Sequence, residues 1–271
     1  REPASFALNY RSGIRDFSGR VDAEWSPRPE HAVMSGAMLT HHRYRPGAVQ
    51  VRLDDPGFAS LDTLLAPSAP VSALEAQLYA EDDWRVTRAL RLNLGLHASL
   101  YNVEGRTFSS LEPRLAARYR VGERTSLKAS WVRMRQYVHL LTNSGIGLPT
   151  DLWVPATDRV PAQSSWQAAL GAARTVGDWS LEAETYWKEM DGLLEYREGT
   201  SFFGAAASDW EAAVVSGEGR SLGLELLARK TAGRTTGYNT CGGKRRTTPR
   251  HQQRYNARRR RHTPTTPHTL T

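Results

Sequence analysis

Apolar and polar residues alternate along much of the chain. Between residues 74 and 80 the even positions are Leu or Ala, whereas the odd positions from 75 to 83 are Glu, Gln, Tyr or Asp. Between residues 90 and 100 the even positions are again Leu or Ala, and Arg91, Asn93 and His97 fall between them. A period of two residues predicts strands with one apolar face and one polar face.

Segments of this kind predict nine strands of 11 to 15 residues and the start of a tenth near Arg234. Strands of soluble proteins usually have about 5 or 6 residues, whereas a tilted strand needs about 9 to 11 residues to cross a bilayer. The lengths therefore favour strands that span a membrane. The nine predicted strands cover residues 14–25, 32–43, 73–83, 90–100, 109–121, 124–138, 165–176, 179–191 and 219–231.

The predicted connections alternate in length. Long ones cover residues 45–72, 139–164 and 192–218, a moderate one covers 102–108, and the others are short. Short turns on one side and long loops on the other are typical of outer-membrane barrels. A soluble β-sandwich or up-and-down barrel also alternates, but it predicts shorter strands and loops of similar length at both ends. In a membrane barrel, the aromatic residues near strand ends would form interface girdles: Trp25, Tyr44, Trp84, Tyr101, Tyr119, Tyr137, Trp179 and Trp187.

The run Tyr79–Trp84 is followed by Leu90–Leu96, and the next two predicted strands contain Leu111–Leu115 and Ser126–Ser130. These segments resemble a hairpin and the next two strands of TonB-dependent outer-membrane receptors. The loop from His139 to Gln163 and the series Gly219-Arg220-Ser221-Leu222-Gly223-Leu224-Glu225 also resemble the family. The resemblance covers about residues 1–239.

The resemblance implies an all-β fold, an antiparallel transmembrane β-barrel segment of about ten strands from a larger barrel of roughly 22 strands. It implies a receptor in the bacterial outer membrane that imports a scarce nutrient, such as an iron chelate or a glycan. Its partners would be that extracellular nutrient, the outer-membrane lipid and the TonB system, reached through a plug domain that nothing in this chain resembles. Because an open arc leaves two unpaired edges, the chain is expected to be a receptor fragment that does not transport alone.

Charge divides the chain into two parts. Residues 240–271 hold nine of the 36 Lys and Arg residues and none of the 28 Asp and Glu residues, so the preceding 239 residues are almost neutral. The sequence thus predicts a partial receptor barrel over residues 1–239 and a basic tail over 240–271, rich in Thr, Pro and Arg. The tail is expected to be disordered or translated out of frame. Nucleic-acid binding through a basic arm is not expected for the barrel part, and the alternative function is a soluble β-rich binding or adhesin module that carries such an arm.

No residue pattern points to catalysis, a metal or a cofactor. His41 and His42 are adjacent on a predicted strand and so point to opposite faces, which makes them a poor shared metal site. The acidic run Glu81-Asp82-Asp83 lacks the Gly and the terminal Glu of a calcium loop. We therefore expect no enzyme activity.

Ligand contact is expected from the long loops, because rigid scaffolds carry recognition on their loops. Four loop aromatic residues could stack on a sugar ring or a planar chelate, and the alternative is that they pack the loops against each other. These candidates are Trp153, Phe202, Phe203 and Trp210.

Overall fold

The protein forms one large antiparallel sheet with a small second sheet beside it. The structure, a computed structural model, describes residues 5–54, 61–65, 69–143, 150–197, 209–230 and 238–249. Ten strands follow one another across the large sheet, and β3 pairs with β2 at its side. The strands of the large sheet, in spatial order, are β1 (Ser5–Arg28), β2 (His31–Asp54), β4 (Val71–Arg85), β5 (Leu90–Val103), β6 (Arg106–Arg120), β7 (Thr125–Gln136), β10 (Gln163–Val176), β11 (Trp179–Tyr196), β12 (Val214–Lys230) and β13 (Tyr238–Pro249), with β3 at Leu61–Leu65.

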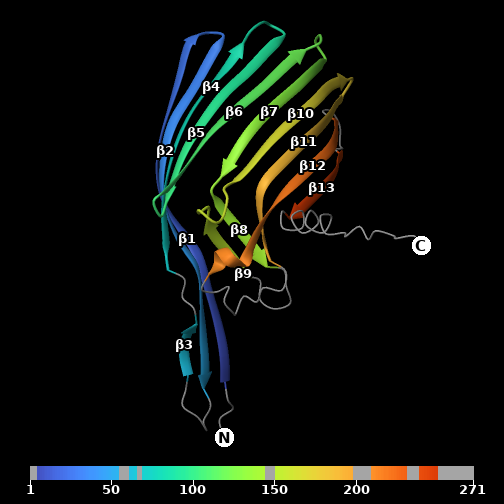
Figure 1. Ribbon diagram of the computed structural model, residues 1–271. Coiled ribbons are helices and arrows are strands. Elements are labelled where there is room, and N and C mark those ends of the chain that lie inside the picture. The colour runs from blue at the N-terminus through green and yellow to red at the C-terminus, as the bar shows by residue number, and fades with distance from the viewer. Residues whose placement is uncertain are drawn as a thin grey trace, which may run out of the picture.

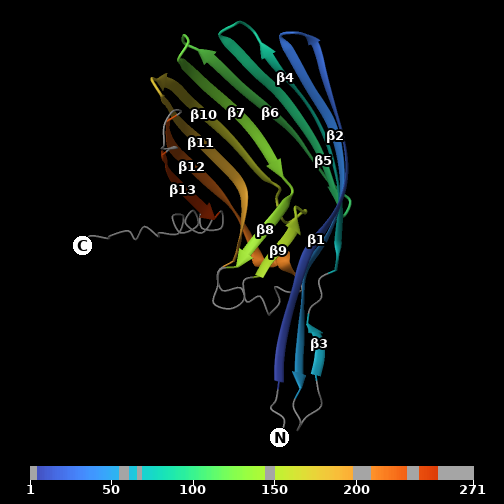
Figure 2. The same cartoon turned by 180° about the vertical axis from the view of Figure 1, so that it is seen from behind.

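The large sheet is a curved wall of tilted strands, open on one side (Figure 1). Its element order confirms the predicted all-β antiparallel barrel segment of about ten strands. The second sheet pairs β8 (Val138–Asn143) with β9 (Thr150–Pro155), and this hairpin lies between the two arms of the wall in both views (Figures 1 and 2). A short 3-10 helix, η2 (Trp210–Ala213), precedes β12.

Most of the predicted short turns are present, and the one at 232–233 lies outside the described residues. Two of the predicted long connections contain strands that the sequence did not predict: β2 extends to Asp54 and pairs with β3 within 45–72, and β8 and β9 lie within 139–164.

Between β5 and β6, where a moderate loop was expected, the structure has a two-residue turn at Glu104 and Gly105. Both residues have positive φ, 49° and 80°, as a type I′ hairpin turn requires. Pairing from Val103 with Arg106 onward therefore lengthens both strands beyond the predicted limits.

The apolar residues of the wall face outward and the polar residues face inward. Leu78 is 61% exposed and Leu100 is 54% exposed, whereas Ser99, which points to the other face, is only 4% exposed. Lipid accounts for this reversal of the usual pattern, because a membrane barrel turns its apolar band toward the hydrocarbon and its polar residues toward the lumen. In the described residues, no helix has the length and apolar character needed to cross a membrane.

The aromatic girdle predicted from the sequence is only partly present. Trp25, Tyr119 and Trp179 are exposed near the short-turn end of the wall, as an interface girdle requires. Tyr44 and Tyr101 are instead fully buried on the inner face, and Tyr137 is buried beside them. The prediction was wrong for these three tyrosines because it considered their nearness to a strand end and not the face they share with the polar residues.

Strand β13 crosses the predicted boundary between barrel and tail. Its backbone pairs with β12 from Ala228–Tyr238 to Gly217–Pro249. In this register Lys244 stands opposite Leu222 and Gly242 opposite Leu224. Residues 250–271 lie outside the described residues, and the out-of-frame origin of the tail stays a prediction.

Two tyrosines lie across glycines of the neighbouring strand on the inner face. Tyr186 of β11 stands opposite Gly223 of β12, and Tyr79 of β4 stands opposite Gly36 of β2. A Cβ atom added at Gly223 would lie 2.3 Å from the ring of Tyr186, and one at Gly36 would lie 2.5 Å from Tyr79. Glycine at these positions lets the tyrosine ring cover the backbone, a known way to stabilise glycine in a sheet.

We predict that Gly223→Ala destabilises the wall, because the added methyl group displaces the Tyr186 ring. The expected loss is about 1 to 3 kcal/mol, as for other overpacked sites. The measurement is the urea midpoint of the chain in detergent micelles, followed by tryptophan fluorescence. The matched control is Gly19→Ala on β1, where an added Cβ meets no atom within 4 Å. Equal midpoints for the two variants would contradict the prediction.

Candidate functional site

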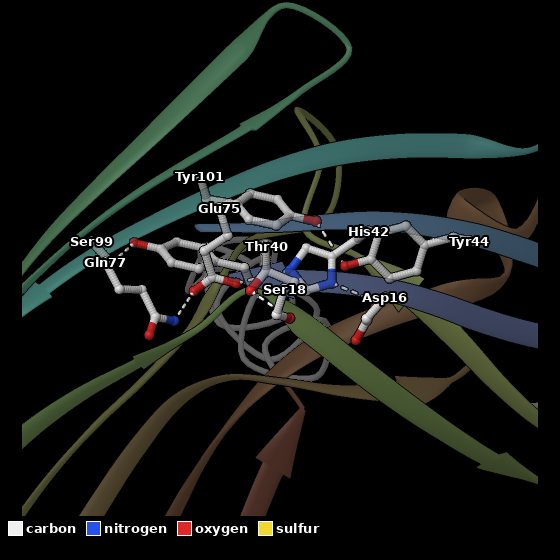
Figure 3. A network of polar contacts seen from close by, with 10 residues as sticks. Asp16, Ser18, Thr40, His42, Tyr44, Glu75, Gln77, Ser99 and Tyr101 are labelled. Atoms are coloured by element: carbon white, nitrogen blue, oxygen red, sulfur yellow. Dashed lines mark hydrogen bonds and ion pairs between the residues drawn. The ribbon is translucent and has the colours of Figure 1, made fainter. Parts of the chain in front are cut away.

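A chain of polar contacts crosses the inner face from β1 to β5, with His42 of β2 at its centre (Figure 3). Nδ1 of His42 lies 2.9 Å from Oδ1 of Asp16, and Nε2 lies 3.1 Å from Oε2 of Glu75. A neutral imidazole donates from one nitrogen only, so hydrogen bonds to two carboxylates require the doubly protonated ring. The buried cation thus joins strands β1, β2 and β4 on the lumen side of the wall.

Tyrosines continue this network toward β7. The hydroxyl groups of Tyr44 and Tyr101 lie 3.0 Å apart, and the ring of Tyr101 stacks on that of Tyr137 with 4.7 Å between centroids. The Tyr137 hydroxyl lies 2.9 Å from Oγ of Ser99, which also donates to the buried carboxylate of Glu112 at 3.3 Å. Polar groups from five neighbouring strands and the residue after β7 therefore hydrogen-bond to one another on the inner face.

The sequence placed His41 and His42 correctly on opposite faces but missed the role of His42. His41 is exposed, whereas His42 is buried between its two carboxylates. The alternation assigns Glu75 to the polar face of its strand but does not say which residue of β2 stands beside it. The strand register decides this. It places Thr40 directly opposite Glu75, and His42, two residues further along the same face of β2, reaches Glu75 diagonally.

The segment from Tyr137 to Ala162 connects the two arms of the wall. At one end Tyr137, Ala156 and Ala162 pack in an apolar cluster with Tyr44 and Tyr101 of the first arm. A second cluster joins the same segment to η2 and β12, through buried side chains at Leu141, Leu152, Val154, Val160, Trp210 and Val214. The hairpin β8–β9 is thus anchored on both sides of the lumen (Figure 2).

Charged residues fasten this segment to the helix η2. Arg159 lies 3.0 Å from Asp209 and 3.1 Å from Glu211, and Thr157 donates a hydrogen bond to Glu211. Hydrogen bonding to the Arg159 guanidinium lowers the pKa of Asp209 below its usual range. Asp209 also accepts a hydrogen bond from the backbone of Ala212 and so caps η2.

Two hollows with charged residues in their lining lie along the inner wall. One, of about 250 Å³, lies toward the short-turn end and is lined by Arg118, Lys128 and Glu184 among others. The other, of about 390 Å³, lies nearer the long loops and is lined by His97, Arg114 and Lys188 among others. Both are open to the lumen side, and both are large enough for small-molecule groups.

The predicted loop aromatics lie in different surroundings. Trp153 of β9 is 37% exposed, whereas Trp210 is 8% exposed and packs in the second apolar cluster. Trp210 therefore helps to pack the loops together, the alternative that the sequence left open. Phe202 and Phe203 lie outside the described residues. Ligand contact by these aromatic residues stays a prediction, and Trp153 has the surface for it.

No metal site is formed by the described part of the chain, which contains no group of three or more His, Cys, Asp or Glu residues able to hold an ion. The acidic run at the end of β4 is used in ion pairs. Asp82 lies 2.6 Å from His31, and Asp83 pairs with Arg91 of β5. These residues fix the short-turn end of the wall.

Comparison with known proteins gives the family. A model of the family described as "TonB dependent receptor-like, beta-barrel" matches residues 5–266. The chain belongs to this family, whose barrels reside in the bacterial outer membrane and whose members are transporters and not enzymes. No curated protein matches the chain significantly.

Solved structures with the same fold have little sequence in common with the chain. The FrpB iron transporter from Neisseria meningitidis is 14% identical, with a TM-score of 0.62 over 89% of this chain and 36% of that one. The copper transporter OprC is 13% identical, with a TM-score of 0.59 over 88% and 38%. The RagAB peptide importer is 10% identical, with a TM-score of 0.55 over 91% and 31%. The chain thus spans about a third of the length of such receptors.

His139 of β8 gives the loop segment a predicted pH dependence. Burial lowers the pKa of His139 to about 4, although its ring has a hydrogen bond to the backbone of Pro161. The unfolded chain therefore binds more protons than the folded chain between pH 6.5 and 4, and stability falls as the pH falls through that window. The loss reaches about 3 kcal/mol at pH 4.

The measurement is urea unfolding of the chain in micelles from pH 8 to pH 4, compared with the same series for His139→Gln. We expect the variant to lose less stability than the original chain across this window, because glutamine does not titrate. Parallel curves for the two proteins would contradict the role of His139.

The two loop tryptophans are predicted to respond differently to substitution. Trp210→Ala is expected to destabilise the loop segment by about 3 to 5 kcal/mol, because it removes a large buried side chain. Trp153→Ala is expected to leave the urea midpoint within about 1 kcal/mol, the range of most substitutions at exposed positions. If Trp153→Ala unfolded the segment as readily as Trp210→Ala, Trp153 would be a packing residue instead of a ligand candidate.

Proposed function

We propose that this chain is the wall segment of a TonB-dependent receptor that imports a scarce nutrient across the outer membrane. In this proposal the inner face lines the lumen, and the segment from Tyr137 to Ala162 forms part of the cargo site at the loop end. Energy comes from the TonB system through a plug domain. No element of the described residues has the role of a plug, so the chain alone is not expected to transport.

The observation that carries the proposal is the outward apolar face together with the inward polar network. A soluble β-rich module would bury its leucines, whereas Leu78 and Leu100 are exposed on the outside of this wall. The buried contacts of His42 lie instead on the inner side. An apolar outer face and a polar inner face are what a membrane barrel needs to carry a polar cargo through its lumen.

The class of cargo is part of the proposal. The similar structures are described as transporters of iron and of copper and as an importer of peptides. A fold that carries such different cargoes does not fix the cargo of this chain. We propose a metal chelate, an oligopeptide or an oligosaccharide, with Trp153 as a stacking surface for its planar or ring-shaped parts.

Growth of the source bacterium tests this function. We would delete codons 137–162 from the gene in the chromosome and measure uptake of labelled iron chelates, copper, oligopeptides and oligosaccharides under limitation of each. High-affinity uptake of one class is expected to disappear, because the deleted segment forms the proposed cargo site. A protonophore is expected to abolish the same uptake in the unaltered strain, since the energy comes from the inner membrane.

A copy of the gene with Leu78→Ile is the matched control. This substitution keeps an apolar side chain on the lipid side, so the copy is expected to restore uptake to the original rate. Uptake of all four classes at unchanged rates in the deletion strain would refute the proposal.

A further inference from the structure

The larger hollow lies where two strands of the wall separate. Pairing between β6 and β7 extends only from Arg120–Ser126 to Arg114–Val132. Beyond that point β6 stays paired with β5, while β7 stays paired with β10 up to Gln136–Gln163. The hollow of about 390 Å³ lies at this divergence, and its lining comes from strands on both sides of it.

Cationic side chains outnumber carboxylates in this lining. Arg114, Arg135 and Lys188 all line the hollow, and Glu112 is the only acidic residue among its described lining residues. Nδ1 of His97 lies 3.5 Å from the Glu112 carboxylate, so that carboxylate already has a neighbour. None of the three cations forms an ion pair with another described residue. The hollow therefore has uncompensated positive charge.

The smaller hollow shows that this excess is not general to the inner wall. There Arg91 pairs with Asp83, Lys128 lies 3.6 Å from Glu182, and Glu184 adds a further negative charge to the lining. Cations and carboxylates of the smaller hollow are thus close to balance. The unbalanced charge is confined to the place where β6 and β7 diverge.

One donor at the larger hollow has no acceptor. Nε of Arg135 is buried from solvent and makes no hydrogen bond within the described residues. Leaving a buried donor without a partner costs free energy, and native structures seldom do so without a reason. A bound group with acceptor oxygens would satisfy this donor and neutralise the cations.

We infer that this hollow is a binding site for a small molecule that carries carboxylate or phosphate groups. The arginine forks of Arg114 and Arg135 match the two oxygens of such a group, and Lys188 adds a point charge. Amide side chains at Gln77 and Gln163 also line the hollow and can bond the neutral part of the ligand. The inference rests on the proposed function, since it names anionic cargo as the class that passes this wall.

Calorimetric titration of the purified full chain in neutral detergent tests the inference. Tricarballylate represents carboxylates, inorganic phosphate represents phosphates, and tetramethylammonium chloride is the cation control. We expect saturable binding of at least one anion and none of the cation. Raising the salt from 50 to 200 mM is expected to weaken binding severalfold, because screening reduces the attraction of the three charges.

Substitutions decide where the anion binds. Arg114→Gln and Lys188→Gln are each expected to weaken binding at least tenfold, whereas Arg114→Lys retains part of it. The matched control is Arg118→Gln, which removes a cation from the same strand and the same face but at the smaller hollow. It is expected to change affinity less than twofold. The urea midpoint of each variant shows that it is folded.

Absence of binding by either anion, or equal weakening by Arg114→Gln and Arg118→Gln, would overturn the inference. Such a result leaves the uptake experiment unaffected, because a receptor for a neutral cargo would still lose uptake on deletion of codons 137–162. Loss of uptake without anion binding therefore refutes the site alone. If the purified chain binds an anion but the deletion of codons 137–162 changes no uptake, the transport function alone is refuted.

Discussion

Backbone hydrogen bonding in a layer without water is the constraint on which this structure depends. Every amide and carbonyl group within the hydrocarbon must find a partner inside the protein, and in a sheet that partner is the adjacent strand. Long uninterrupted registers follow, such as the thirteen consecutive pairs between β10 and β11. Once the registers are fixed, the alternation of side chains sends leucine and alanine to the lipid. The polar residues must then satisfy each other on the inner face.

The inner face meets this demand in two ways. Around His42 the charges are matched, and two carboxylates flank one imidazolium. At the divergence of β6 and β7 they are not matched, because Arg114, Arg135 and Lys188 line the hollow with one carboxylate, that of Glu112, and none of the three forms an ion pair with a described residue. The first arrangement stiffens the wall by linking neighbouring strands. The second leaves positive charge that can attract an anionic ligand from outside the wall.

The sequence predicted the strands well because their alternation is local, and it predicted the inner contacts poorly because they are not. The pattern around Leu94 is sufficient to identify β5, but the neighbours of His42 depend on registers with strands far along the chain. The tyrosines at 44, 101 and 137 show the same limit, since a strand-end position does not reveal the face. Trp210 could not be assigned either, because its cluster combines Leu141 with Val214 across 73 positions.

The anchored loop segment has a consequence for how the chain acquires its structure. Neighbouring strands can form hairpins in the order of synthesis, because most of their turns are short and their contacts are local. The clusters around Tyr137 and Trp210 have much larger sequence separation, and the second requires β12 to be in place. Closing so large a loop is entropically costly, so hairpin β8–β9 is the natural late step of folding. Until then Leu141, Leu152 and Val154 remain uncovered, and this adds an aggregation-prone apolar surface at the loop end of the wall.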